Sequence, residues 1–389
     1  MLKIGVIGAE RRGKIARLAH QPENGIHLVA ASTLHPERIA GMKEIYGPDF
    51  FITGDYRELL RQPLDAVFIC TPDYLHEEHT LAAMEAGKAI YLEKPMAISV
   101  EGCDRILAAA KARGTLLYLG HNMRFSPVMQ KMKALIDAGT IGEVQSIWCR
   151  HFISYGGDAY FKDWHSERRH SHGLLLQKGA HDIDVIHWLA GAYTRRVVGM
   201  GKLSVYDKLP RRHPDTPQPP VVKNNDHWPP ATTTGYSPNI DVEDSSMILM
   251  QLANGVQACY LQSHYTPDDV RNYTIIGTEG RIENYGDRST EEREAAIHVW
   301  NRRSGYQEQG HVIHKVPYLA GAHGGSDPRI VQEFLDVIQG KPASKEAATP
   351  LDARMSVATG YHGTESLRNG NCPCDIPPVN LTCKSGIEG

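Results

Sequence analysis

One short segment in the second half of the chain gathers side chains that are suited to acid–base chemistry. The sequence LLLQKGAHDIDVIHWL, residues 174–189, includes His181, Asp182 and Asp184. The ordinary pKa of imidazole lies close to neutral pH, so His181 is suited to remove a proton from a hydroxyl group. In a helix that begins near residue 180, His181 and Asp184 lie on one face. The segment therefore predicts part of a catalytic site.

A lysine at the end of an apolar strand is a second candidate. In YLEKPMAIS, residues 91–99, Lys94 follows a run that is typical of a buried strand, although lysine itself is rarely buried. At the carboxyl edge of a parallel sheet such a side chain points into the ligand crevice. The preceding strand ends in ICTPDYLH, residues 69–76. The residues expected to contact a cofactor at these two strand ends are Thr71, Pro72, His76, Glu93 and Lys94.

The turn after the first strand predicts a dinucleotide-binding loop. In VIGAERRGK, residues 6–14, Gly8 and Gly13 occupy the first and last glycine positions of the fingerprint G-x-G-x-x-G. Gly8 makes the tight turn in this interpretation, Gly13 allows close packing of helix on strand, and the helix N-terminus holds the pyrophosphate. Glu10 replaces the middle glycine, and its charge argues against close contact with a phosphate. Arg11 and Arg12 are the residues that could compensate.

The sequence does not choose between NAD and NADP. A carboxylate about 20 residues after the turn usually binds the ribose 2′-hydroxyl of NAD. Here the second strand ends in Ser32 and Thr33, so hydroxyl groups replace the carboxylate. No arginine for the 2′-phosphate of NADP stands out after that strand, although Arg11 or Arg12 could serve.

Two different patterns of apolar residues along the chain predict the elements that position these residues. The first 120 residues alternate short apolar runs with segments of helical spacing, which is typical of a parallel sheet covered by helices. Longer β-rich runs follow, and Asn254-Gly255 between two of them predicts a hairpin. We expect an α/β Rossmann domain (residues 1–123) and an α+β domain with an open, mainly antiparallel sheet for substrate binding and oligomerisation (residues 124–370). A C-terminal tail (residues 371–389) completes the chain.

Composition excludes several classes of protein. The net charge of the 389 residues is −3, so the basic footprint of a nucleic-acid-binding protein is missing. No apolar run approaches the roughly 20 residues that cross a bilayer, and the N-terminus lacks the pattern of a signal peptide. Seven scattered cysteines do not predict a disulfide framework. We expect a cytoplasmic protein with neither nucleic acid nor membrane as partner.

One insertion fits no regular element. Residues 209–237, beginning LPRRHPDTPQPPVV, are rich in proline, asparagine and threonine. An irregular stretch of this length is typical of a functional lid, an oligomer arm or local disorder, and composition does not separate the three.

Together the motifs resemble the Gfo/Idh/MocA family of glucose–fructose oxidoreductases, inositol dehydrogenases and rhizopine-catabolism proteins. The resemblance rests on the glycine turn, CTPDYLH, the EKP triplet, GHNMRF at residues 120–125 and the KGAHDIDVIHWL helix, in the family's order. It implies a nicotinamide cofactor and hydride transfer at a secondary alcohol of a sugar, glycoside or cyclitol. It also implies a small-molecule carbohydrate substrate and a homodimer or homotetramer.

The resemblance assigns roles to individual residues. Lys94 corresponds to the family's active-site lysine, His181 to its catalytic histidine and Asp184 to the acid three residues later. Within GHNMRF, we expect Asn122 at the cofactor and Arg124 at the substrate.

Gln177 departs from the family pattern, which has an aspartate there. A carboxylate would raise the pKa of the histidine, whereas an amide can only orient it by hydrogen bonds. The departures at Gln177 and Glu10 keep one alternative open, an NAD-dependent glycosidase or lyase that oxidises its sugar transiently and recycles the cofactor. A further class is a sensor that has kept the fold and lost the chemistry, and the presence of Lys94, His181 and Asp184 argues against it.

The loop before the catalytic helix predicts substrate recognition. Its sequence WHSERRHSHG, residues 164–173, is rich in histidine but lacks a recognisable metal-ligand spacing, so we expect polyol recognition and no metal. Aromatic side chains suit the apolar face of a sugar ring. Asp182 and His187 are expected to be solvated or to support the residues that touch substrate. The residues expected at the substrate are Lys94, Arg124, Tyr155, Trp164, His165, His181 and Asp182.

Overall fold

Buried strands and capped helices build the first half of the chain. In this computed structural model, which describes residues 1–219 and 221–382, caps mark both ends of some helices. For example, α4 (Val100–Arg113) begins where Ser99 Oγ accepts a hydrogen bond from Gly102 N at 3.0 Å. It ends at Gly114, whose φ of +64° is the left-handed conformation that terminates many helices.

The described residues form two compact units. The first comprises residues 1–122, 326–354 and 378–389, of which 383–389 lie outside the described part, and the second comprises residues 123–325 and 355–377. The helix α10 (Ser326–Ile338) therefore belongs to the first unit, although its place in the sequence groups it with the second domain. The predicted tail, residues 371–389, lies partly outside the described residues.

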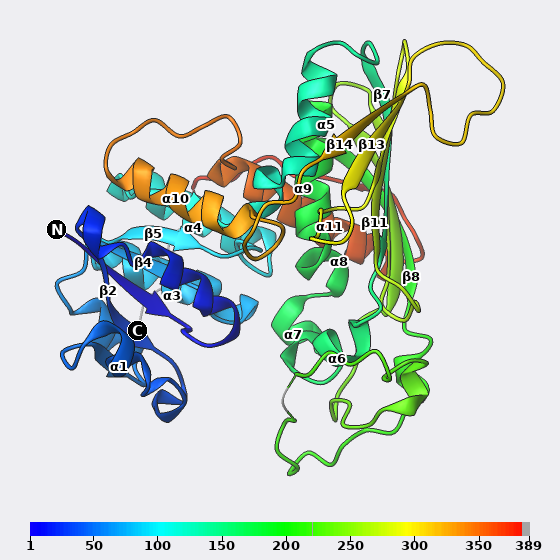
Figure 1. Cartoon of the computed structure of the whole chain (residues 1–389). Coiled ribbons are helices and arrows are strands. Elements are labelled where there is room, and N and C mark those ends of the chain that lie inside the picture. The colour runs from blue at the N-terminus through cyan, green and yellow to red at the C-terminus, as the bar shows by residue number, and fades with distance from the viewer. Residues whose placement is uncertain (220, 383–389) are drawn as a thin grey trace. The chain divides into compact units, whose positions relative to one another are not determined.

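A parallel six-stranded sheet forms the first unit (Figure 1). Its order is β3-β2-β1-β4-β5-β6. The strand order runs outward from β1 to β3 on one side and from β4 to β6 on the other, so the order reverses between the neighbours β1 and β4. This order is that of a doubly wound dinucleotide-binding domain, so the predicted Rossmann fold is confirmed. The strands are β1 (Leu2–Ile7), β2 (Ile26–Ser32), β3 (Phe51–Thr53), β4 (Ala66–Ile69), β5 (Ala89–Leu92) and β6 (Leu117–Leu119).

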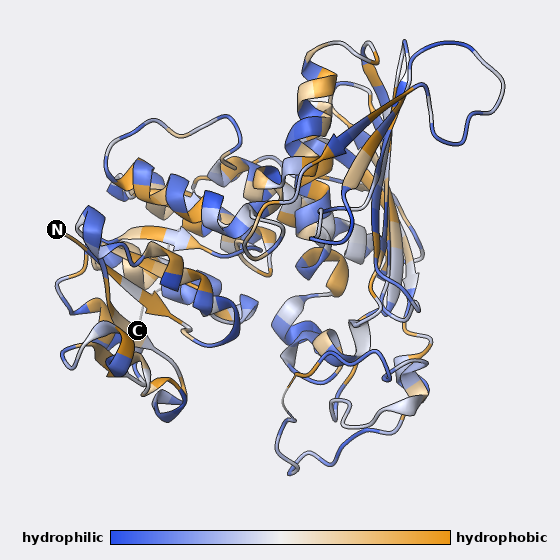
Figure 2. Ribbon diagram, viewed as in Figure 1, coloured by the Kyte–Doolittle hydropathy of each residue, from blue (hydrophilic) through white to orange (hydrophobic). Residues whose placement is uncertain are grey.

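Helices cover this sheet because its strands are apolar on both faces. All four residues of β4 are buried. The strands of the first unit include some of the most hydrophobic segments of that unit (Figure 2). Phe334 of α10 packs its ring 5.3 Å from that of Phe68 and 5.5 Å from that of Tyr91. The other elements of this unit include the 3-10 helices η1 (Arg11–Ala19), η2 (Pro22–Asn24), η3 (Pro36–Ile39) and η4 (Asp73–Leu75) and the helices α1 (Met42–Tyr46), α2 (Tyr56–Leu60) and α3 (His76–Glu85).

A nine-stranded sheet forms the second unit, in the order β14-β13-β12-β11-β7-β10-β9-β8-β15. All of its pairs are antiparallel except β7 with β10, so the predicted open, mainly antiparallel sheet is confirmed. The predicted hairpin at Asn254-Gly255 joins β9 to β10, with Gly255 at a φ of +89°. The strands are β7 (Val144–Phe152), β8 (Thr194–Lys202), β9 (Ser245–Leu252), β10 (Gln257–Ser263), β11 (Val270–Gly277), β12 (Arg281–Tyr285), β13 (Ala295–Trp300), β14 (Val312–Val316) and β15 (Cys374–Asp375).

Helices pack on one face of this second sheet. Figure 1 shows α5 (Pro127–Asp137) and α9 (Gly179–Ala190) beside the strands, and both contact the sheet. Gly199 N of β8 donates to Ser366 Oγ of α11 (Pro350–Arg368) at 2.9 Å. Short helices α6 (Gly156–Tyr160), α7 (Arg168–Ser171) and α8 (Leu174–Gln177) lead into α9. In the described part of the chain, no helix has the length and apolar character needed to cross a membrane.

Candidate active site

The glycine turn of the first unit has the geometry of a dinucleotide loop. Gly8 has a φ of +81°, and its N–H donates to Ser32 O at 2.9 Å, which holds the turn against the end of β2. A Cβ on Gly13 would lie only 2.0 Å from Gly8 O, so no larger residue fits there. These two positions suit the close approach of a cofactor phosphate. The group that fits this cradle is a dinucleotide.

Glu10 turns toward the end of β2. Its Oε1 accepts a hydrogen bond from Thr33 Oγ1 at 2.6 Å, and its Oε2 lies 3.4 Å from Arg38 Nη1. Partial burial raises the pKa of Glu10, but the Thr33 hydrogen bond and the charge of Arg38 outweigh it and leave the pKa below its ordinary value. A carboxylate therefore stands where the sequence places only Ser32 and Thr33, and Ser32 itself is buried. Arg38, the nearest cation, was not singled out from the sequence.

Arg12 is engaged by carboxylates within the first unit. Its Nε donates to Glu93 Oε1 at 2.6 Å, and its guanidinium forms two hydrogen bonds with Asp327, at 2.6 and 3.1 Å. Asn122 Nδ2 donates to the same Asp327 at 2.8 Å. The contacts favour a structural role for Arg12 over the phosphate contact expected from the sequence. Asp327 was missed because α10 follows Arg12 by more than 300 residues.

A histidine ties together the loops that follow β4 and β5. The Nδ1 and Nε2 atoms of His76 lie 2.6 Å from Pro95 O and 2.9 Å from Thr71 O. Burial lowers the pKa of His76. Lys94, in the loop after β5 and half-buried, has its backbone N–H 3.3 Å from Glu93 Oε2. His76 and Glu93 therefore position the strand end that carries Lys94, and contact of Thr71, Pro72 and Arg11 with a cofactor stays a prediction.

The helix predicted to be catalytic, α9, begins at Gly179, one residue before the predicted start. The apolar run is divided into α8 and α9, with Lys178 between them. A Cβ on Gly179 would lie 3.0 Å from Tyr260 Cε1, so the helix starts where it is pressed against the sheet. His181 lies in the first turn of α9 and is half-buried, and Gln177 is buried at the end of α8.

Asp184 is held by an arginine. Arg124 Nε and Nη2 donate to its two oxygens at 2.8 and 2.6 Å, and both side chains are at most 4% exposed. The structure thus brings together two residues that the sequence assigned to different roles, catalysis and substrate binding. A bidentate pair fixes both groups in orientation. Since the pair engages both oxygens of Asp184 and two N–H groups of Arg124 and is buried, it favours a positioning role for each.

Asp182 is completely buried, so of its two expected roles the solvated one is wrong and the supporting one agrees with its contacts. Its oxygens lie 2.5 Å from Tyr273 OH, 3.1 Å from His151 Nδ1 and 3.1 Å from Arg271 Nε. Burial raises the pKa of Asp182, yet Arg271 and the hydrogen bonds lower it far more. The net pKa lies well below the ordinary value. Burial and Arg271 lower the pKa of His151 to about 3, so the imidazole is neutral near pH 7. Sequence reasoning missed these three partners, which come from the distant strands β7 and β11.

The histidines of the loop before the helix, residues 164–173, do not face a common point. His165 Nδ1 hydrogen-bonds Asp163, and the His165 ring stacks on Trp164 at 3.7 Å. The His172 ring stacks on Tyr361 at 3.9 Å, and His172 faces Glu365. His170 faces a different acid, Glu167. Within the described residues, no three metal-ligating side chains gather. His187 is buried against Thr194, with Nε2 2.8 Å from the hydroxyl oxygen, and so supports the helix.

The insertion packs on α6 within the second unit. Buried Asp158 accepts hydrogen bonds from His227 Nδ1 at 2.8 Å, Lys162 Nζ at 2.8 Å and Asn224 N at 3.3 Å. Lys162 Nζ also donates to Thr233 Oγ1 at 3.1 Å. The described part of residues 209–237 is therefore an ordered loop, anchored beside the expected substrate residue Tyr155.

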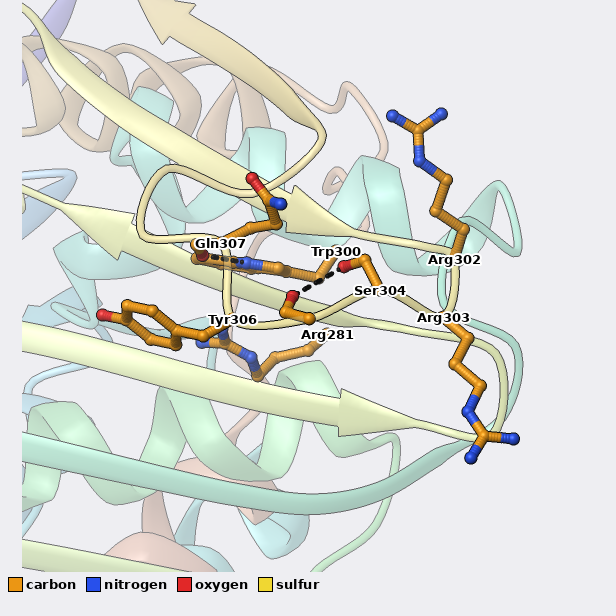
Figure 3. A pocket seen from close by; sticks show the side chains of 8 residues that line it. Arg281, Trp300, Arg302, Arg303, Ser304, Tyr306 and Gln307 are labelled. Carbon is orange, nitrogen blue, oxygen red and sulfur yellow. Dashed lines mark hydrogen bonds between the residues drawn. The ribbon is translucent and has the colours of Figure 1, made fainter.

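A shallow pocket of about 290 Å³ lies elsewhere in the second unit, at the loop between β13 and β14 (Figure 3). Arg281 lies 3.5 Å above the ring centroid of Trp300, whose Nε1 donates to Gln307 O at 2.7 Å. Figure 3 shows Arg302 and Arg303 pointing away from these stacked groups. The pocket contains no carboxylate or imidazole for acid–base chemistry and none of the expected site residues.

Comparison with known proteins decides the family. Residues 2–121 match the oxidoreductase family's NAD-binding Rossmann fold, and residues 133–376 match its C-terminal alpha/beta domain. The chain belongs to the Gfo/Idh/MocA oxidoreductase family. The resemblance seen in the sequence is thereby confirmed, and this Gfo/Idh/MocA protein carries both of the family's domains.

Individual relatives of this Gfo/Idh/MocA protein match over part of their length. The uncharacterized oxidoreductase YrbE of Bacillus subtilis is 32% identical over 51% of this chain and 56% of its own. Inositol 2-dehydrogenase of Klebsiella pneumoniae is 32% identical over 48% of this chain and 54% of its own. The matches thus span about half the length of these curated relatives. A levoglucosan dehydrogenase structure, in complex with NADH and L-sorbose, superposes with a TM-score of 0.76 at 21% identity over 97% of this chain and 100% of its own, and so shares the fold.

Proposed function

We propose that this protein is an NAD-dependent dehydrogenase that oxidises a secondary alcohol of a sugar, glycoside or cyclitol. The observation that carries the proposal is the retention of Lys94 at the end of β5 and of His181 in the first turn of α9, in a chain that belongs to this family. Relatives named inositol 2-dehydrogenase and levoglucosan dehydrogenase support the substrate class.

In the proposed reaction His181 and Lys94 act on one hydroxyl group. His181 Nε2 or Nδ1 takes the hydroxyl proton, and the Lys94 ammonium donates a hydrogen bond to the same oxygen as negative charge develops on it. A nicotinamide cofactor held at the turn of Gly8 and Gly13 would supply the hydride acceptor that converts the carbinol carbon to a carbonyl carbon. The oxidised product, reduced cofactor and one proton balance the alcohol and oxidised cofactor.

The ion pairs of the second unit support this assignment to His181. The two carboxylates that follow His181 in α9 are both bound by arginines, Asp182 by Arg271 and Asp184 by Arg124. Neither carboxylate is therefore available as a mobile proton acceptor. Their role in the proposal is to fix the first turn of α9, so that His181 meets the substrate in one orientation.

We further propose that the cofactor is NAD rather than NADP. Glu10, hydrogen-bonded to Thr33 at the end of β2, offers a carboxylate near the place where the family's fingerprint binds the ribose. A 2′-phosphate beside it would meet a like charge, whereas a 2′-hydroxyl can donate to it.

We also propose that copies of the chain associate through the uncovered sheet face. Trp148, Cys259 and Leu249 lie opposite one another across β7, β10 and β9, so they share one face, and Leu249 is 63% exposed. Their neighbours Cys149, Tyr260 and Ile248 point to the opposite, buried face. An exposed apolar row of this kind is typical of a protein interface.

The test is a screen with NAD and a panel of free sugars, aryl glycosides and inositols, followed by the absorbance of the reduced nicotinamide. The proposal expects net accumulation of reduced cofactor with at least one member of the panel. Release of the aryl group without accumulation would instead show the recycled-cofactor glycosidase.

A further inference from the structure

Two lysines share one tyrosine beside the catalytic helix. Lys178 Nζ donates to Tyr155 OH at 3.2 Å and lies 5.6 Å from the ring centroids of both Tyr155 and Tyr160. Lys223 Nζ lies 3.5 Å from the Tyr155 ring centroid. The two amines therefore flank the two sides of one phenol, its hydroxyl and its ring. All of these residues belong to the second unit.

Neither amine has a carboxylate partner. Across residues 1–219 and 221–382, no carboxylate oxygen lies within 4.0 Å of either Lys178 Nζ or Lys223 Nζ. Asp182, a nearby acid, is bound by Arg271. Burial and the charge of Arg271 lower the pKa of Lys178 to about 7. A half-buried ammonium without a counter-ion is costly, and an anionic ligand would remove that cost.

The insertion holds Lys223 in place. Its neighbour Asn224 donates its backbone N–H to buried Asp158, which also binds His227 and Lys162. Because Asp158 and Tyr155 lie at the same short helix, α6, this anchor sets the position of Lys223 above Tyr155. An exposed lysine on an unanchored loop would have no fixed partner. The site is therefore built from two segments, one of which is the irregular insertion.

Lys178 also stands close to the proposed base. It directly precedes α9, and His181 follows it by three residues, within one helical turn. A substrate whose hydroxyl group reaches His181 can therefore reach the two amines with a substituent a few bonds away.

We propose that Lys178, Lys223 and Tyr155 bind the carboxylate of a sugar acid, a uronate or an aldonate, and that this acid is the substrate oxidised at His181. The second half of the statement rests on the proposed dehydrogenase function. A carboxylate suits the site better than a phosphate. Phosphate sites usually employ the fork of an arginine, and the arginine here, Arg271, is bound to Asp182.

The proposal predicts a pH dependence for binding. Protonated Lys178 binds an anion, so affinity is high below about pH 7 and falls as the pH rises through that value, and the bound acid shifts the midpoint upward. The histidines that face Lys178 do not titrate in this range, because burial lowers the pKa values of His151 and His264 to about 3. The charged groups that act on Lys178 are Arg271 of β11, Asp182 of α9, Lys223 of the insertion and Asp287 after β12.

The test is calorimetric titration of the full-length protein with NADH present, so that no turnover is needed. The probes are D-glucuronate, D-galacturonate, D-gluconate, D-glucose and D-glucose 6-phosphate. At least one sugar acid should bind roughly tenfold or more tightly than D-glucose, and Lys178→Gln and Lys223→Gln should each remove most of that preference. Lys208→Gln, an equal charge change at an exposed residue, is the control and should leave it intact.

Lys223→Gln is the decisive variant because Lys223 is exposed and its loss does not endanger folding. Equal binding of glucose and all three acids, or an unchanged preference in Lys223→Gln, overturns the proposal. Preferential binding of the sugar phosphate overturns the carboxylate assignment. Oxidation of neutral sugars without any acid preference counts against this site alone. Tight, Lys223-dependent binding of an acid that is never oxidised counts against the dehydrogenase function alone.

Discussion

Arg124 donates two hydrogen bonds to Asp184, at 2.8 and 2.6 Å, in a pair that solvent barely reaches. The pair joins the segment before α5 to the first half of α9, and thereby fixes the helix that carries His181. A buried ion pair contributes less net stability than its Coulomb attraction suggests, but breaking one partner leaves an uncompensated charge. The loss of stability on removing one partner therefore measures how strongly the pair holds α9 in place.

Breaking this pair should destabilise the second unit. Arg124→Met or Asp184→Leu alone should lower the free energy of unfolding by about 3 kcal/mol, because each leaves one buried charge without its partner. The double variant should lose clearly less than the sum of the two single losses. Urea unfolding of the four proteins measures the cycle. Additive losses would show that the two side chains are not coupled.

Glu10 should set the choice of cofactor. The wild-type protein is expected to bind NADH at least about tenfold more tightly than NADPH, and Glu10→Gln should narrow that ratio by about tenfold because it removes the charge facing a 2′-phosphate. Fluorescence titration with both cofactors gives the ratio. Glu37→Gln, which removes the charge of an exposed acid in η3 after β2, is the matched control. A wild-type preference for NADPH would refute the assignment.

The Asp182 cluster predicts loss of stability in acid. Burial lowers the pKa of His151 to about 3 in the folded protein, so the unfolded chain binds its proton first, between about pH 6.5 and pH 3. The contribution of His151 to stability is therefore full above about pH 6.5 and falls through this window, by at most about 1.4 kcal/mol per pH unit for one proton. The lowered pKa of Asp182 adds a loss that begins near its unfolded value of about 4 and continues to lower pH.

His151→Gln should flatten that acid limb. The free energy of unfolding, measured by urea at several pH values, should fall less steeply between about pH 6.5 and pH 4 than in the wild type. Other histidines whose pKa burial lowers, among them His264 at about 3 and His79 and His172 at about 4, remain in both proteins and supply a residual slope. Identical slopes would mean that His151 does not titrate on unfolding.

The exposed apolar row on the second sheet should govern assembly. Leu249→Glu places a charge in the row formed with Trp148 and Cys259, and should convert an oligomer to monomers in sedimentation velocity. Tyr306→Glu, on the loop between β13 and β14 and 91% exposed, should leave the sedimentation coefficient unchanged. A wild-type protein that is already monomeric would contradict the proposed association.

The fold could be predicted from the sequence because the local signals along the chain agree with one another. Apolar runs of strand length, the glycine turn and Asn254-Gly255 each fix structure within a few residues, and the model of a parallel sheet followed by an antiparallel one is confirmed. The weak strands β3 and β15, with three and two residues, carry too little pattern to be seen. The start of α9 was predicted to within one residue because Gly179 interrupts the run.

The site was harder to predict because its partners are distant in sequence. Nothing near Asp182 reveals that Arg271, 89 residues later, will bind it, or that Asp327 will bind Arg12 from the far end of the chain. The sequence assigns no role to Lys178, because the feature that matters is the absence of a carboxylate partner. That feature exists only after the insertion has folded onto Asp158.

Lys94→Ala, assayed with NAD and the best alcohol found in the screen, tests the central claim most directly. The account predicts that turnover falls at least about a hundredfold, because the ammonium that stabilises the developing charge is lost, while the Kd for NADH changes by no more than about twofold. Undiminished turnover in this variant, with cofactor binding intact, would contradict the proposed chemistry.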